Sequence, residues 1–134
     1  MIDSVEKSAP EFDWVTGRYE CSLPNVFKKL KNDIQEDVMT RNGLRPSQST
    51  YEFSVTDDGS TFTVVLDGNE VHKYISFTLA EHSIVVKDDK GYQMFDVTVN
   101  FNEKAECKLV ANEVARELWE IRRMALEELL FRTF

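Results

Sequence analysis

Residues 51–101 alternate between large apolar and polar side chains, and turn-forming pairs interrupt the alternation. Asp58-Gly59 and Gly68-Asn69 are typical of two-residue hairpin turns, because these residue types accept a positive φ. With further turns at Glu81-His82 and Asp89-Lys90, the large apolar residues fall on one face, whereas a slip of one residue would scatter them. The pattern therefore predicts an antiparallel meander with one apolar face.

The four turns also predict which residues face one another across each hairpin. Beyond the last turn the apolar alternation continues through residues 94–101, and residues 106–110 form a further candidate strand. These segments together predict a sheet of five to seven strands. The predicted cross-strand pairs include Val55–Phe62, Leu66–Val71, Phe77–Val86 and Ile84–Phe95.

A helix is predicted before the meander. Ser22 is a typical cap residue and Pro24 is tolerated in a first helical turn, while Asn42-Gly43 supplies a left-handed stop. Ahead of this helix, the alternation within residues 13–23 predicts a short strand. The apolar residues of the helix recur in one narrow stripe, so it has a single face to bury: Phe27, Leu30, Ile34 and Val38.

The end of the chain predicts a longer helix, with Asn112 as its cap and a last turn near Phe131. Two apolar stripes cover about half of its circumference, which is more than a helix lying on one surface needs. Arg122 lies between the stripes, where its alkyl stem can follow apolar neighbours. The first stripe is Val114, Leu118, Ile121, Ala125 and Leu129, and the second is Trp119, Leu126 and Leu130, with Ala115.

Two explanations account for the second stripe. The N-terminal helix could lie beside the C-terminal helix and cover it within one chain. Alternatively, a protein partner or a second copy of the chain covers it, as in a homodimer, with Trp119, Leu126, Leu130 and Arg122 as interface candidates. The second explanation predicts a non-enzymatic protein-interaction or self-association domain.

The predicted fold class is α+β. We expect a single antiparallel β-meander sheet of five to seven strands, with the N-terminal helix and the long C-terminal helix packed on its apolar face. A chain of 134 residues fits one domain, which we place at residues 13–134 after a polar lead-in over residues 1–12.

The order of a strand, a helix, a meander and a long C-terminal helix resembles the layout of helix-grip domains, in which a curved sheet grips the last helix around an apolar ligand. This resemblance implies a small apolar ligand in a cavity between sheet and helix, as an alternative function. A filled core made of the same side chains is the favoured interpretation. The candidate pocket residues are Phe53, Phe62, Phe77, Phe95, Ile121 and Ala125.

The chain carries 24 acidic and 16 basic residues, for a net charge of −8. This charge repels phosphate backbones and anionic membranes, so neither nucleic acid nor a membrane is expected as a partner. The sequence has no apolar run near the roughly 18 residues that would span a bilayer, and no signal-peptide pattern, which predicts a cytoplasmic protein. Cys21 and Cys107 are then expected to be two buried thiols.

Motifs for catalysis or cofactor binding are sparse. His72 and His82 have no second ligand-type residue at metal-site spacing, so neither a metal nor another cofactor is expected. Tyr74, Ser76 and Asp96 share the polar face of the predicted sheet with His72, and such a cluster could do acid–base work inside a cleft. An enzyme is therefore the third and least favoured function.

Overall fold

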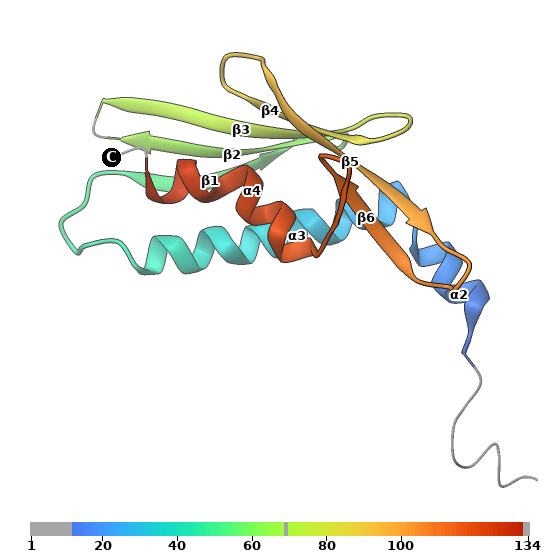
Figure 1. Cartoon of the computed structure of the whole chain (residues 1–134). Coiled ribbons are helices and arrows are strands. Elements are labelled where there is room, and N and C mark those ends of the chain that lie inside the picture. The colour runs from blue at the N-terminus through green and yellow to red at the C-terminus, as the bar shows by residue number, and fades with distance from the viewer. Residues whose placement is uncertain (1–11, 69, 133–134) are drawn as a thin grey trace, which may run out of the picture.

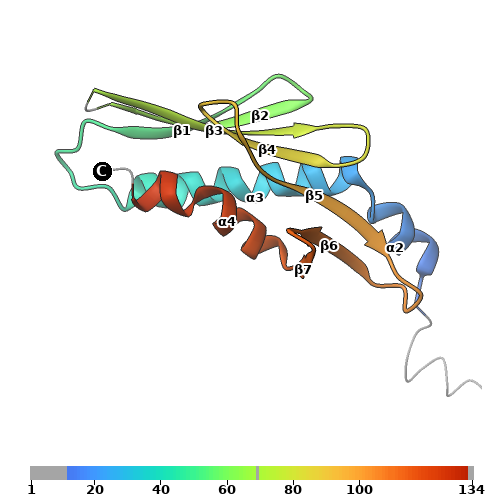
Figure 2. The same cartoon turned by 45° about the horizontal axis from the view of Figure 1, so that its top comes forward.

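The computed structural model describes residues 12–68 and 70–132, in which seven strands form one antiparallel sheet with two long helices on one face (Figures 1 and 2). The strands follow one another in chain order from β1 to β7. The predicted α+β meander with an N-terminal and a C-terminal helix is confirmed. The elements are α2 (Trp14–Glu20), α3 (Leu23–Gly43), β1 (Glu52–Asp57), β2 (Thr61–Gly68), β3 (Val71–Leu79), β4 (Ile84–Asp88), β5 (Gln93–Phe101), β6 (Cys107–Ala111), β7 (Val114–Arg116) and α4 (Leu118–Phe131).

Residues 1–11, which make up nearly all of the predicted polar lead-in, lie outside the described residues. The same holds for residue 69 and residues 133–134. Across residues 12–68 and 70–132, no helix is both long enough and apolar enough to cross a membrane.

The core lies between the apolar face of the sheet and the two helices α3 and α4. Phe62 and Phe77 stack across β2 and β3 with ring centres 4.7 Å apart. Phe27 of α3 packs on Phe62 at 5.1 Å, and Ile121 of α4 belongs to the same buried cluster. The apolar stripe predicted for α3 is confirmed, since Phe27, Leu30, Ile34 and Val38 are all buried.

The predicted register is confirmed in the third hairpin, where Phe77 pairs with Val86. The other three hairpins differ from the prediction by two residues. A shift of two preserves the alternation of the pleat, so the apolar residues stay on the predicted face. The observed pairs are Val55–Val64, Leu66–Lys73 and Ile84–Val97, in place of Val55–Phe62, Leu66–Val71 and Ile84–Phe95.

The turns of the first two hairpins lie further along the chain than predicted. The backbone N–H of Asp58 donates to Thr61 O at 3.0 Å, and the Asp58 carboxylate accepts from Thr61 N at 2.9 Å, so this pair closes the first turn. In the second hairpin Glu70 takes a φ of 63°, while Gly68 still pairs with Val71. Local side-chain bonding and backbone angle therefore set the register, rather than the glycine pairs alone.

Residues Trp14–Glu20 form helix α2, so the strand predicted within residues 13–23 is wrong. Asp13 caps this helix, because its carboxylate accepts from Thr16 N at 3.1 Å and from Thr16 Oγ1 at 2.7 Å. Val15 and Tyr19 are four residues apart, and this spacing fits one helical turn as well as a strand. The side-chain cap by Asp13 favours the helix over the strand.

The C-terminal helix α4 begins at Leu118, later than predicted, because the residues before it form strand β7. Asn112 and Glu113 have φ values of 53° and 65°, so they form the tight turn between β6 and β7. Asn112 is therefore not the helix cap, and this position is taken by Glu117. Two members of the predicted helical stripes belong to β7 and are exposed, namely Val114 and Ala115.

Helix α3 starts and ends at the predicted residues, but the predicted left-handed stop at Asn42-Gly43 is wrong, because neither residue has a positive φ and Leu44 is the C-cap. Ser22 accepts the Asn25 N–H at 3.4 Å at its beginning, and Gly43 is its last residue. Near this end the Asn42 side chain bonds to the backbone of β1, since its amide donates to Phe53 O at 2.8 Å and its carbonyl accepts from Phe53 N at 3.0 Å. Asn42 thus occupies the place that a further strand would take at the edge of the sheet.

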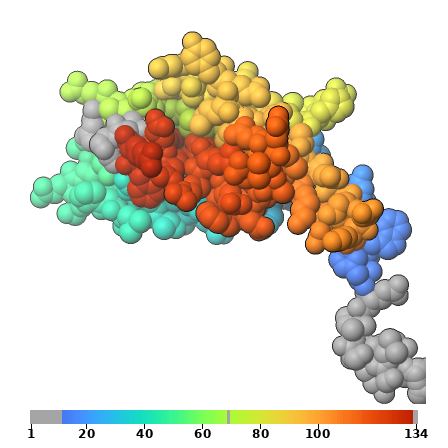
Figure 3. Space-filling model, viewed as in Figure 1, coloured from blue at the N-terminus to red at the C-terminus, as the bar shows by residue number. Residues whose placement is uncertain are grey.

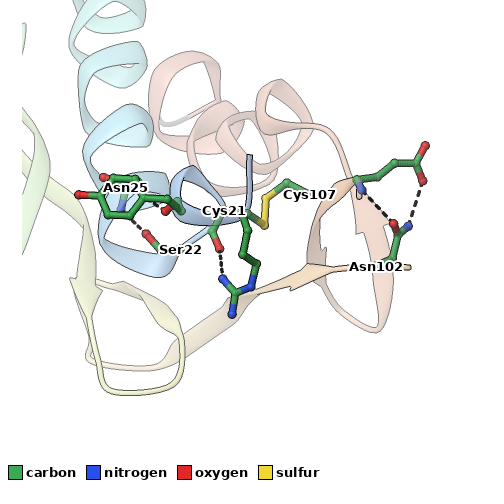
Figure 4. Close-up of a disulfide and its surroundings, with 8 residues drawn as sticks. Cys21, Ser22, Asn25, Asn102 and Cys107 are labelled. Atoms are coloured by element: carbon green, nitrogen blue, oxygen red, sulfur yellow. Dashed lines mark hydrogen bonds between the residues drawn. A yellow bond between two sulfur atoms is a disulfide. The ribbon is translucent and has the colours of Figure 1, made fainter. Parts of the chain in front are cut away.

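Cys21 and Cys107 form a disulfide, so the prediction of two buried thiols is wrong (Figure 4). Cys21 lies between α2 and α3 and is 3% exposed, whereas Cys107 opens β6 and is exposed. The cysteines are 86 residues apart, and their pairing depends on where the β5–β6 hairpin meets the start of α3. Sequence spacing carries no information about that meeting point.

Removing the disulfide is expected to lower the free energy of unfolding by about 3–5 kcal/mol, because the bond closes a long loop in the unfolded chain. The test is urea unfolding of the oxidised protein and of a Cys21→Ser/Cys107→Ser variant. The wild type in a dithiol reductant should match the variant. Equal midpoints for the oxidised and reduced wild type would contradict a stabilising role for the bond.

Candidate interaction surface

One end of the molecule is organised around Arg41, a charged side chain of α3 that is buried. Its Nε donates to the backbone oxygen of Leu130 at 2.8 Å, in the last turn of α4. Its guanidinium carbon lies 5.2 Å from the ring centre of Phe53 and 5.1 Å from that of Phe131. Arg41 therefore ties together α3, β1 and the end of α4.

A second contact joins the two helices near the start of α4. Arg122 Nε donates to Asp37 at 2.7 Å, and its Nη1 lies 3.4 Å from a carboxylate oxygen of Asp33, both on α3. Beneath this bridge Leu126 and Leu130 are buried. Helix α3 thus lies beside α4, as the first explanation for the second apolar stripe requires.

Trp119 is the member of that stripe on α4 that remains accessible, with 53% of its surface exposed. Of the four predicted interface residues, Leu126 and Leu130 are buried and Arg122 is bonded to α3. Of the predicted interface residues, only Trp119 therefore remains as an exposed apolar side chain.

An apolar groove of about 590 Å³ runs between α3 and α4. Every residue that lines it belongs to α3, to its C-cap Leu44, or to α4, so the sheet does not contribute. Leu126 and Leu130 line the groove from below, while Trp119, Leu44 and Phe131 are exposed around it. Figure 3 shows the outer side of α4 with α3 below it. We call this feature the α3–α4 groove.

The exposed side of α4 also carries a ridge of four residues at a constant spacing of four, namely Trp119, Arg123, Glu127 and Phe131, and all four line the α3–α4 groove. We call it the α4 ridge. Arg123 is bonded to Glu127, and Arg132 Nη2 donates to Glu127 at 2.9 Å. The hydrogen bond from Arg123 holds the pKa of the Glu127 carboxyl below its usual value, so this group is ionised at neutral pH.

The residues of the predicted ligand pocket lie in the core. Phe62 and Phe77 stack on one another, and the remaining four are also buried, so the structure brings all six together as packed side chains. The set is Phe53, Phe62, Phe77, Phe95, Ile121 and Ala125.

The polar cluster around His72 lies on the opposite face of the sheet. His72 Nδ1 is 3.6 Å from a carboxylate oxygen of Asp67, and the rings of His72 and Tyr74 are 6.1 Å apart. Asp96 lies on β5, where it pairs with Val85 of β4, so β4 separates it from His72 on β3. Neither His72 nor Asp96 lines the α3–α4 groove or any of three smaller grooves. The described residues include no group of three His, Cys, Asp or Glu side chains that could hold a metal ion.

Sequence reasoning missed Phe131, Leu44 and Arg41 as parts of this surface. Phe131 has a signal in the sequence, because it continues the four-residue spacing that starts at Trp119. Leu44 and Arg41 come from the other helix, and only the packing of α3 beside α4 brings them to the groove. A second exposed apolar set on and just before α2 was missed with that helix: Phe12, Trp14, Val15 and Tyr19.

Comparisons with known protein families, curated proteins and solved structures gave no match to this chain. The functional argument therefore depends on the geometry of the described residues.

Replacing Arg41 with Met is expected to lower the free energy of unfolding by about 2–4 kcal/mol, because the Leu130 carbonyl loses a buried donor and three rings lose a cation. Methionine keeps much of the apolar stem, so the loss reports mainly on the guanidinium. Lys28→Met, at an exposed position of the same helix, is the control. Similar urea midpoints for the two variants would contradict the assigned role of Arg41.

Proposed function

We propose that this chain is a non-enzymatic self-association domain that uses the α3–α4 groove as its interface. The observation that carries the proposal is the exposure of three large apolar side chains around one apolar groove: Trp119 at 53%, Phe131 at 57% and Leu44 at 67%. Half-exposed aromatic residues at a groove are typical anchors of protein interfaces.

The charges around the groove favour a second copy of the chain as the partner. Arg123 and Glu127 lie side by side on the exposed face of α4, so this surface carries both signs. An interface between two identical surfaces needs this kind of self-complementarity. A strongly basic or acidic partner has no comparable match here, and the net charge of −8 disfavours nucleic acid.

The ligand-binding and enzymatic alternatives stay predictions. The candidate pocket side chains are packed against one another, and the His72 cluster is on the sheet face away from the helices. No observation among the described residues favours either alternative over self-association.

Trp119→Asp is expected to raise the dissociation constant of the self-associated form by at least about thirtyfold, because it replaces an exposed aromatic side chain of the groove with a charge. The measurement is sedimentation velocity over a range of protein concentrations. Trp14→Asp is the matched control, since Trp14 is the other tryptophan and is exposed on α2. A wild type that stays monomeric at every concentration, or equal effects of the two variants, would reject the proposal.

The cytoplasmic prediction implied that both cysteines are reduced. Because Cys21 and Cys107 are joined, we propose instead that the chain works in an oxidising compartment, where such bonds persist. The test is alkylation of free thiols in intact cells before lysis, followed by mass spectrometry of the tryptic peptides. We expect both cysteines to be unmodified by the alkylating agent. Alkylation of both would favour the cytoplasm.

A further inference from the structure

The α4 ridge has an aromatic residue at each end and two residues of opposite charge between them. Trp119 and Phe131 are the two ends, and Arg123 and Glu127 lie at equal distances from the midpoint. The ridge spans about 18 Å, from twelve residues at about 1.5 Å each. Turning it around therefore places an aromatic ring on an aromatic ring and a cation on an anion.

We propose that two copies of the chain pair through their α4 ridges in antiparallel orientation about a two-fold axis, with Trp119 of each copy against Phe131 of the other and Arg123 against Glu127. This inference rests on the proposed self-association and specifies its geometry. Both copies present the same surface, so the assembly closes as a dimer.

Helix packing rules accommodate this arrangement. Side chains four residues apart form the ridges that interdigitate in the commonest class of helix pairs, at a crossing angle of about −50°. The rims of both copies supply further apolar contact, because Leu44 is exposed and also lines the α3–α4 groove. The indole of one copy would then meet the groove of the other at Phe131, whose ring lies against the Arg41 guanidinium.

A parallel arrangement of the same two ridges is disfavoured by charge. It would place Arg123 against Arg123 and Glu127 against Glu127, which are like charges in direct contact. The antiparallel arrangement instead gives each Glu127 carboxylate a third arginine neighbour, the Arg123 of the partner, beside Arg123 and Arg132 of its own chain. The charges thus select the orientation, and the aromatic residues supply apolar area.

Charge reversal tests the register. We expect Arg123→Glu alone and Glu127→Arg alone each to weaken the dimer at least about tenfold, because each homodimer then contains two like-charge contacts. An equimolar mixture of the two variants should form a heterodimer with near wild-type affinity, since the acidic ridge of one chain meets the basic ridge of the other. Lys90→Glu, at an exposed position between β4 and β5, is the control and should dimerise like the wild type.

The single variants and the mixture together test this register, because in a parallel pair the wild type already has two like-charge contacts and neither single change would weaken it further. In each single variant the bond between Arg123 and Glu127 within the helix is lost, and mixing cannot restore it, so recovery on mixing reports only on contacts between chains. If the mixture stays dissociated while the wild type dimerises and Trp119→Asp does not, the register is rejected and the groove interface stands. If the wild type is monomeric throughout, both proposals fail. Circular dichroism melting of each variant confirms that it is folded.

Discussion

The contact of Arg41 with the end of α4 fixes the arrangement of the two helices. The last carbonyls of a helix have no partner within it, and a cation is favourable there because of the helix dipole. Arg41 supplies a donor to Leu130 from the neighbouring helix, while its planar group lies among the rings of Tyr51, Phe53 and Phe131. The position of the last turn of α4 therefore depends on Arg41, while Arg122 joins α4 to Asp37 and Asp33 of α3 nearer the start of the helix.

Much of the fold could be predicted because its signals are local and periodic. The alternation in the meander survives an even shift in register, which explains why the faces of β1 to β5 were predicted correctly although three of the four hairpins pair differently. The start of α3 follows from Ser22, whose side-chain cap acts within one turn. Its end does not follow from a left-handed glycine, because Gly43 has no positive φ. Helix α2 was missed because a spacing of four residues fits a strand as well as a helix. The cap by which the Asp13 carboxylate accepts from Thr16 N favours the helix, and composition does not reveal this bond.

The candidate site was harder to predict because it joins residues from separate elements. The two apolar stripes of α4 correctly indicated more apolar surface than a sheet alone can cover. They could not distinguish Leu126, which α3 covers, from Trp119, which it leaves exposed. The disulfide is a similar case, since the partner of Cys21 depends on how the β5–β6 hairpin folds back toward α3. Long-range placement of this kind needs the three-dimensional packing.

The bond between Asn42 and Phe53 limits the ways in which copies of this chain can join. A bare edge strand invites another chain to add to the sheet, and repeated addition leads to open-ended fibres. Here an amide from α3 already holds both backbone groups of Phe53, and Arg45 holds the carbonyl of the nearby Tyr51 at 2.5 Å. At the far side the terminal strand β7 has three residues. Growth through main-chain pairing is thereby discouraged, which leaves side-chain surfaces to determine how large an assembly can become.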